Sequence, residues 1–550
     1  GPAASLYGNA AGGVLHFETR APAEVPFRPE LFTLSGSDGL LQLRGTASGS
    51  SAGVGYLVSA ARVTYDGFRR NPGPDEDGTY GGARRNSVNA TLHLPGGPGR
   101  LRATVNWVDL AAENPGSLSQ TLLDEGDRQA FTGNVNQRTR KDVQQTQLGV
   151  SWDGPLGTAR AEFAGYGQLR TVDNPIPSDI VFVDRTALGG RALMEVGGEP
   201  GGVPVAVGGG LELDVQRDDR QNYRNAQGER GELRLDQFER VRGAGAFGYV
   251  RAAVMPQADV TAGVRYDHFD FSVTDRFVSG TDPDDSGART MDAVSPSVGV
   301  TVRPLDRIEL FGTVATSFET PTTTELANRP DGAGGFNPAL QPTRGTTLEA
   351  GLRAVLTVPV SLEVTAHRTS LRDELVPFEV PDVPGRTFFS NAGRSTHRGV
   401  EVALNAVGPS GLSGRAAVSW LDARFREYSR GGNTFDGNRI PGMAPRTVDA
   451  VVRWGPGLWF VEARGQHRGA VPVDDGNTAE ADAYNLLDLR GGTRPLRMGG
   501  FDVAPVAGIN NVLDTQYVAS VAVNAFGGRF FEPGPARSFY LGIRAGGGAR

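Results

Sequence analysis

Apolar and polar side chains alternate along much of this chain. In the stretch LHLPGGPGRLRATVNWVDL, residues 92–110, the odd positions from Leu101 to Trp107 are apolar and the even positions between them are polar. A period of two is typical of a β-strand with one apolar and one polar face. A Pro/Gly-rich turn separates this run from a second alternating run, Leu92 to Leu94, so the pattern predicts a hairpin.

The same alternation recurs over the whole chain, for example in residues 360–367 and 538–545. About 22 strand-like segments can be distinguished, each with ends defined to roughly two to four residues. They cover residues 30–36, 39–48, 52–65, 84–94, 100–110, 144–153, 157–172, 184–197, 204–217, 240–253, 258–273, 291–303, 307–317, 344–357, 359–372, 386–407, 413–427, 445–454, 457–469, 483–493, 500–509 and 536–545.

The connections between these segments alternate between two kinds after the first hairpin. Short, Gly/Pro-rich turns lie at 95–99, 153–157, 197–202, 255–258 and 455–457. Long, polar connections lie at 66–83, 111–143, 218–239, 274–290, 318–343, 428–444 and 510–535. Outer-membrane barrels sort their connections in this way, whereas a soluble sandwich has no such requirement.

The pattern therefore predicts an all-β fold, a transmembrane antiparallel β-barrel of about 22 strands. Its apolar face would contact lipid and its polar face would line a lumen, which a barrel of this size has to plug. Trp152, Trp454 and Trp459 lie beside tight turns, as expected for an interfacial aromatic girdle. The alternative is that they are core aromatics of a soluble β protein.

Composition narrows the possible functions. The chain contains no run of 18 apolar residues, which argues against transmembrane helices, and no cysteine, which excludes disulfides and thiolate chemistry. The net charge of −7 argues against a nucleic-acid partner. The sequence GAGAFG, residues 243–248, matches a dinucleotide-binding fingerprint, but it lies within a predicted strand. The six histidines are dispersed and form no short metal-binding motif.

Several stretches resemble TonB-dependent outer-membrane receptors. The segment LYGNAAGGVLHFETR, residues 6–20, is similar to the end of their plug domain, with Tyr7, Gly8, Gly12, Gly13 and Arg20 at the matching positions. Further similar blocks, in the same order as in the family, lie at residues 317–354, 388–404, 509–518 and 527–545. The mid-barrel block looks most like the iron-chelate subgroup, which includes ferric citrate receptors.

The resemblance implies two parts, the end of a plug at residues 1–22 and a receptor barrel at 23–550, with most of the plug missing. It implies active uptake of a ferric siderophore or similar iron chelate, rather than catalysis, across the outer membrane of a Gram-negative-type bacterium. The iron chelate would be cargo, and no cofactor or resident metal is implied. Partners would be the TonB–ExbB–ExbD complex, outer-membrane lipid and lipopolysaccharide, around a monomer. Uptake of cobalamin or a saccharide, a passive porin-like channel, and a soluble all-β enzyme or adhesin remain alternatives.

Basic and aromatic residues in the predicted extracellular loops are candidates for ligand binding. Arginine forks suit carboxylate-bearing iron chelates, and tyrosine rings could stack on a ligand. The alternative is that the loop charges are simply solvated. The candidates are Arg69, Arg70, Tyr80, Arg84, Arg85, Arg138, Arg140 and Tyr223.

Overall fold

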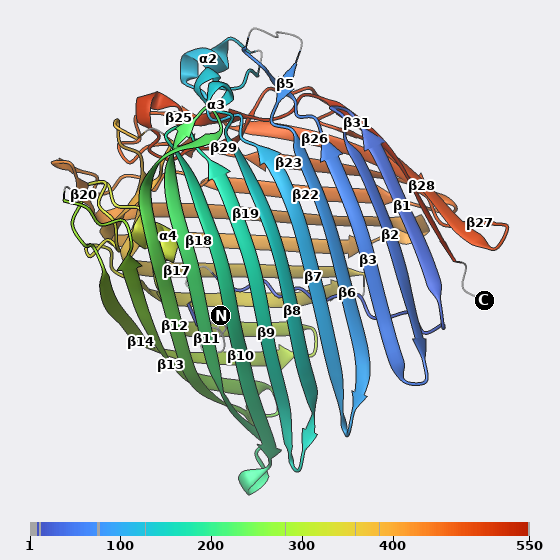
Figure 1. The fold of residues 1–550 in the computed structure, drawn as a ribbon. Coiled ribbons are helices and arrows are strands. Elements are labelled where there is room, and N and C mark those ends of the chain that lie inside the picture. Colours follow the sequence, from blue (N-terminus) through green and yellow to red (C-terminus); the bar gives the residue numbers. More distant parts are fainter. Residues whose placement is uncertain are drawn as a thin grey trace.

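The computed structural model of the chain describes residues 8–9, 13–73, 78–126, 128–280, 282–357, 359–383 and 385–547. Within these residues, the long strands form one antiparallel sheet in which each strand pairs with the next along the chain (Figure 1). The last strand, β31 (Ser538–Gly547), pairs with the first, β1 (Arg28–Gly36), which closes the sheet into a barrel. Among the described crossings, each strand therefore has a neighbour on both sides, as a sheet in lipid requires.

The described sheet contains 22 crossings of the barrel wall, as the sequence pattern predicts. The short β27 (Leu496–Met498) continues the crossing begun by β26, since both pair with β28. The other crossing strands are β2 (Leu41–Ser51), β3 (Val54–Tyr65), β6 (Ala83–Gly96), β7 (Gly99–Glu113), β8 (Arg140–Leu156), β9 (Ala159–Pro175), β10 (Asp179–Gly198), β11 (Val205–Ala226), β12 (Glu229–Met255), β13 (Ala258–Asp275), β14 (Gly287–Leu305), β15 (Ile308–Glu319), β16 (Thr343–Thr357), β17 (Val360–Phe378), β18 (Phe388–Val407), β19 (Leu412–Glu427), β22 (Arg446–Trp454), β23 (Trp459–Arg468), β26 (Tyr484–Thr493) and β28 (Phe501–Asn510).

The barrel has its apolar side chains on the outside. On β14, Val294, Val298 and Val300 are exposed, whereas the alternate residues Ser295 and Ser297 are buried. The closing strand β31 repeats the pattern, with Leu541 60% exposed on its outer face. A soluble protein would bury these apolar residues instead, so the exposed apolar band is consistent with a lipid-facing surface. Among the described residues, no helix is long and apolar enough to cross a membrane.

Tight turns and long loops lie at opposite ends of the barrel (Figure 1). The turn 455–458 carries Trp454 and Trp459, whose rings meet edge to face at 4.9 Å and are each 45% exposed. Trp152 also lies near a turn, where its Nε1 donates to the carbonyl of Gly96 at 2.8 Å. Exposed indoles beside the turns match the position of an interfacial aromatic girdle.

One predicted long loop is wrong. Residues 218–239 continue β11 and β12, which pair up to the two-residue turn at 227–228. Charged side chains dominate both strands here, among them Arg220 and Glu239, because this hairpin end carries no apolar face toward lipid. Without that alternation, a strand has the same polar composition as a loop.

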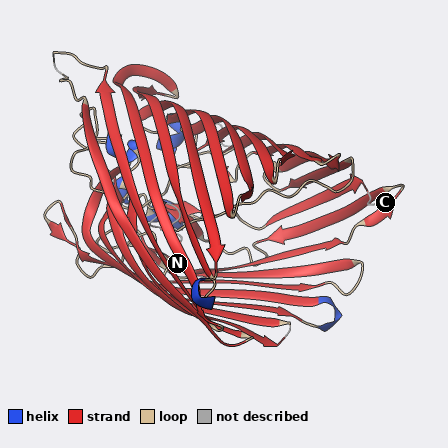
Figure 2. Ribbon diagram, turned by 90° about the horizontal axis from the view of Figure 1, so that it is seen from below, coloured by secondary structure: helices blue, strands red, loops and turns tan. Residues whose placement is uncertain are grey.

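The loops fold into short elements over one end of the barrel. The view in Figure 2 looks through the ring of strands and shows helices within its outline. The described loop elements are β4 (Arg69–Arg70), β5 (Thr79–Tyr80), α2 (Gln120–Asp124), α3 (Thr132–Asn136), α4 (Thr323–Ala327), β20 (Ser429–Arg430), β21 (Asn433–Thr434), β24 (Val471–Pro472), β25 (Glu480–Ala481), β29 (Val518–Val521), η3 (Phe526–Gly528) and β30 (Phe531–Pro533). The turns at the other end hold η1 (Pro200–Gly202) and η2 (Pro409–Gly411).

Candidate functional site: the barrel interior

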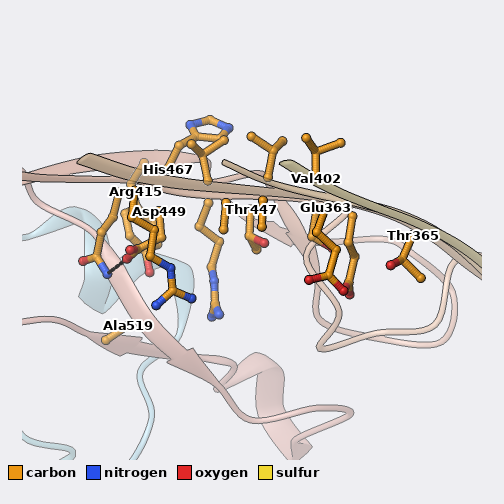
Figure 3. Close-up of a pocket in the computed structure, with 17 residues that line it drawn as sticks. Glu363, Thr365, Val402, Arg415, Thr447, Asp449, His467 and Ala519 are labelled. Carbon is orange, nitrogen blue, oxygen red and sulfur yellow. Dashed lines mark hydrogen bonds between the residues drawn. The ribbon is translucent and has the colours of Figure 1, made fainter. Parts of the chain in front are cut away.

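An open chamber of about 710 Å³ lies against the inner wall formed by β17, β18, β19, β22, β23 and β26. We call it the lumen chamber, and its lining includes Glu363, Glu401, Arg415, Asp449, Gln466 and Arg468. Figure 3 shows Glu363, Thr365 and Asp449 on one side of the wall, and Val402 and His467 on the other. Ala519 of β29 faces the lining from across the chamber, so an extracellular loop bounds the space as well.

The charges in the lumen chamber are only partly compensated. Asp449 accepts hydrogen bonds from Arg464, at 2.5 Å, and from Gln466, at 3.3 Å. Among the described residues, no carboxylate lies within ion-pairing distance of Arg415 or Arg468. Two unpaired guanidinium groups in one chamber can bind an anionic ligand, because each presents a planar fork to carboxylate or phosphate oxygens.

A second polar region lies where the loop 320–342 folds onto the inner wall. Asp218, Arg220 and Glu239 are almost completely buried, and Arg220 donates to Glu239 at 2.5 Å. The helix α4 caps this group: Thr323 donates to Asp218 at 3.1 Å, and Thr324 accepts from Arg220 at 2.9 Å. The loop therefore covers charges that would otherwise face the bore.

The helix α4 begins where the sequence provides a capping box. The Thr322 hydroxyl accepts from the backbone N–H of Glu325, and the Glu325 carboxylate accepts from the backbone N–H of Thr322. This reciprocal pair satisfies two amides that a helix start leaves free. Leu326 is fully buried in a cluster with Phe271 and Phe318, so the helix is held by apolar packing as well.

The residues that resemble the end of a plug are only partly described. Tyr7 and Gly12 lie outside the described residues. Gly13 has a φ of 107°, a conformation that glycine adopts without strain. The Arg20 guanidinium donates to Glu30 of β1 at 3.4 Å.

Residues 8–9 lie inside the barrel, against the wall and the α4 loop. A Cβ added at Gly8 would come within 2.4–2.5 Å of the Asp267 carboxylate and the Arg265 guanidinium, so a larger residue would have to displace these side chains. The Asn9 side chain accepts from the backbone N–H of Thr320 at 2.7 Å. The N-terminal segment therefore contacts the same part of the interior that the α4 loop covers.

Two of the candidate loop residues, Arg69 and Tyr80, join loops to one another. Arg69 is 3% exposed and donates to the carbonyls of Gly116, at 3.1 Å, and Gln129, at 2.6 Å. Burial lowers its pKa to about 10, so it remains charged at neutral pH. The Tyr80 hydroxyl donates to the carbonyl of Thr139 at 2.8 Å, and burial raises its pKa to about 12. Both side chains hold the loop 114–139 against β4 and β5.

Four further candidates lie near this loop assembly. Arg70 donates to the Gln129 side chain at 2.9 Å, and Arg140 pairs with Asp142 at 2.9 Å. The Arg138 side chain is exposed, beside Gly228. The other aromatic candidate, Tyr223, lies under the Arg230 guanidinium, 5.1 Å from the ring centroid.

The adjacent candidates Arg84 and Arg85 lie on opposite faces of β6. In the strand register, Arg84 shares its face with the exposed residue Leu92, whereas Arg85 shares its face with the buried residue Thr91. Because faces alternate along a strand, Arg84 points outward and Arg85 points into the lumen. Only Arg85 of this pair can reach a ligand in the bore.

Comparisons with known proteins agree with this architecture. The family model for the β-barrel of TonB dependent receptor-like proteins matches residues 28–512. The chain belongs to the TonB-dependent receptor family. Its barrel is an outer-membrane barrel of that family, and the family's members are transport receptors rather than enzymes.

Solved receptors share the fold at low sequence identity. The ferric citrate transporter FecA, in its unliganded form, has a TM-score of 0.81 at 16% identity, covering 99% of this chain and 82% of that one. The ferric yersiniabactin uptake receptor FyuA from Yersinia pestis has a TM-score of 0.80 at 17% identity, covering 99% and 84%. The siderophore receptor PiuA from Acinetobacter baumannii has a TM-score of 0.76 at 14% identity, covering 96% and 82%.

Sequence reasoning on this receptor concentrated on the loops and missed the lumen chamber. The polar face of each strand is the sequence signal for a lumen lining. It does not show that Arg415 and Arg468, which are single residues in separate strands, line the same chamber. The GAGAFG stretch lies within β12, where no helix N-terminus can bind a dinucleotide phosphate. Among the described residues, no group of three or more histidine or acidic side chains is placed to hold a metal ion.

Proposed function

We propose that this TonB-dependent receptor takes up a ferric siderophore or a similar anionic iron chelate across the outer membrane of a Gram-negative-type bacterium. The observation that carries the proposal is the pair Arg415 and Arg468, which lack carboxylate partners among the described residues and face one open chamber. Iron chelates of this kind carry carboxylate or other anionic oxygens, and guanidinium forks bind such groups with two hydrogen bonds.

The printed functions of the structural neighbours support the same cargo. Two of the receptors compared above are named for a ferric chelate, ferric citrate or ferric yersiniabactin, and the third is named a siderophore receptor. We extend that cargo class to this chain because the bore, the extracellular loops and the two unpaired arginines of the lumen chamber are compatible with it. Neutral saccharides have no anionic group for Arg415 and Arg468 to bind, and cobalamin has only one, a phosphodiester, so both have less to gain from two arginines.

Transport itself would depend on a plug and on energy from the inner membrane. We propose that residues 1–22 are the end of a plug domain and that residues 23–550 are the barrel. The partners would be the TonB–ExbB–ExbD complex, surrounding lipid and lipopolysaccharide, and the receptor would act as a monomer. The approach of Gly8 to Arg265 and Asp267 supports a plug contact at this wall.

Binding to the purified full chain tests the cargo. We expect saturable fluorescence quenching with at least one of a panel of ferric citrate, a ferric catecholate and a ferric hydroxamate. The double variant Arg415→Gln with Arg468→Gln should bind that chelate about 10²- to 10⁴-fold more weakly, because each of the two charged hydrogen bonds contributes about 1.5–3 kcal/mol. Saturable binding of cobalamin or a saccharide, with no response to any iron chelate, would contradict the proposal.

A matched pair of single variants tests whether the ligand enters the bore. Arg85→Ala, on the lumen face of β6, should weaken chelate binding, whereas Arg84→Ala, on the outer face, should leave the affinity unchanged. Equal effects of the two changes on affinity would exclude a ligand in the lumen beside Arg85. In cells, growth on the chelate should require an intact tonB gene; growth without it would indicate passive, porin-like entry.

A further inference from the structure

A groove lined by arginines lies on the outer face of β16–β19, on the side of the extracellular loops. It encloses about 630 Å³. Six arginines line it: Arg344, Arg368, Arg372, Arg394, Arg398 and Arg426. We call it the arginine groove, and it is separate from the lumen chamber because its side chains belong to the opposite face of the wall.

The strand register fixes that outward orientation. Val402 lies on the outer face of β18 (Figure 3), and two steps of two residues lead along that face to Arg398. Val402 pairs with Val364 of β17, from which the same two steps lead to Arg368 and two further steps lead to Arg372. The residues on this face of β17 are exposed from 366 to 372 at every second position, which agrees with the register.

The arginines form two rows with hydroxyl groups between them. Cross-strand pairing places Arg368 beside Arg398, and four residues further out it aligns Arg344, Arg372 and Arg394. The intervening row is Thr346, Ser370 and Thr396. Alternate residues on one face are about 7 Å apart along a strand, so a phosphate above the hydroxyl row can reach guanidinium groups from both rows.

The positive charge of the arginine groove is only partly compensated. Glu427 pairs with Arg394, and Asp422, which lies beside Arg398 in the strand register, bonds to Arg424. Among the described residues, no carboxylate lies within ion-pairing distance of Arg368, Arg372, Arg398 or Arg426. At the corresponding end of β10 and β11, the outer face instead carries Asp184 and Asp219. Like charges directly opposite each other across strands are destabilising, so the groove favours an anionic partner.

The outer face of the barrel is apolar on the membrane side of the groove. Leu348, Val400 and Trp420 lie on the same outer face, and each is at least 40% exposed. A lipid with phosphate groups on its head and acyl chains below would match both surfaces at once, whereas a soluble anion would use only the arginines. The loops at this end of the barrel place the groove at the outer leaflet.

We propose that the arginine groove binds the phosphate groups of a phosphorylated glycolipid of the outer leaflet, with its acyl chains along the apolar band. The proposal rests on the outer-membrane placement in the proposed function, but not on the identity of the cargo. The six guanidinium groups and the hydroxyl row would hold the head group, and the lipid would fix the orientation of β16–β19 in the membrane.

Native mass spectrometry of the full chain in a neutral detergent tests the proposal with diphosphorylated lipid A as the probe. We expect saturable binding that is at least tenfold weaker in the double variant Arg368→Gln with Arg398→Gln. The matched control is Arg217→Gln with Arg242→Gln, two exposed arginines on the outer faces of β11 and β12. This control removes the same charge and should retain wild-type affinity.

Two further arms separate the possible sources of affinity. Dephosphorylated lipid should bind at least tenfold more weakly than the diphosphorylated form, and inorganic phosphate at millimolar concentration should not compete. Equal binding by the two double variants, or by the two lipids, would overturn the proposal, as would full competition by phosphate alone. Chelate quenching is measured on the same samples, so lost lipid binding with intact chelate binding rejects only this inference.

Discussion

Replacing Arg220 with methionine would remove the only cation within reach of the buried Glu239 carboxylate in the described residues. Arg220 and Glu239 are 1% and 0% exposed, and the guanidinium Nε donates to the carboxylate at 2.5 Å. Methionine keeps much of the volume but carries no charge. Gln237 would still donate to Glu239 at 2.8 Å, so one hydrogen bond to the carboxylate remains.

The cost of this change falls on the closed position of the α4 loop. Breaking a buried ion pair by removing one partner costs about 3–5 kcal/mol, because the remaining charge is buried without compensation. Thr324 also loses the hydrogen bond that it accepts from Arg220 at 2.9 Å. Opening the loop would hydrate Glu239, so the free energy of opening should fall by about that 3–5 kcal/mol, which is roughly 10²- to 10⁴-fold in the opening equilibrium.

Hydrogen exchange of residues 320–342 measures this equilibrium, since amide exchange reports local opening. The amide of Gly335, which donates to the Gln237 side chain at 3.0 Å, and that of Asn337, which donates to Leu326 at 2.7 Å, should exchange faster in Arg220→Met. The control Arg217→Met changes an exposed arginine of the same strand and should leave exchange unchanged. Adding Glu239→Gln to Arg220→Met should restore most of the protection. Exchange within threefold of the control would refute the reasoning.

Two other changes test the barrel and its loops. Val364→Arg should destabilise the barrel in lipid vesicles by about 2–4 kcal/mol, because it places a charge on the lipid face. Thr365→Arg, on the lumen face, should change the stability little. Equal urea midpoints for the two variants would contradict the assignment of apolar residues to the outside. Arg69→Met should loosen the loop 114–139 by about 1–3 kcal/mol, because buried carbonyls lose their donor, and hydrogen exchange should increase there. The exposed Arg138→Met is its control, and unchanged protection in Arg69→Met would show that the loop is held by other contacts.

The barrel could be predicted from the sequence because its physical requirement is periodic. Each crossing needs an apolar residue at every second position, as on β31, and each turn needs residues that allow a tight reversal. The prediction failed at 218–239, where β11 and β12 run beyond the apolar band and both faces are polar. Periodicity detects a strand only where its two faces meet different surroundings.

The interior could not be predicted in the same way, because closure brings its residues together. Arg415 of β19 and Arg468 of β23 are separated by more than fifty positions in sequence, yet line one chamber. The loop candidates drew attention because their charges are adjacent in sequence. Adjacency is misleading on a strand, where Arg84 and Arg85 face opposite sides, and Arg69 proves to be a buried loop anchor.

The alternation of outer and lumen residues along the strands also locates the outer boundary of the hydrocarbon. On β17 the outer face reads Val360, Leu362, Val364 and Ala366, and then changes to Arg368. Pairing sets Ala366 beside Val400 and Arg368 beside Arg398, so the change falls at one level on both strands. On β19, Trp420 pairs with Val400 and Asp422 with Arg398, which continues the same level. Since charged side chains are costly in hydrocarbon, a level shared by three strands marks where the lipid head groups begin, and the arginine groove lies directly above it.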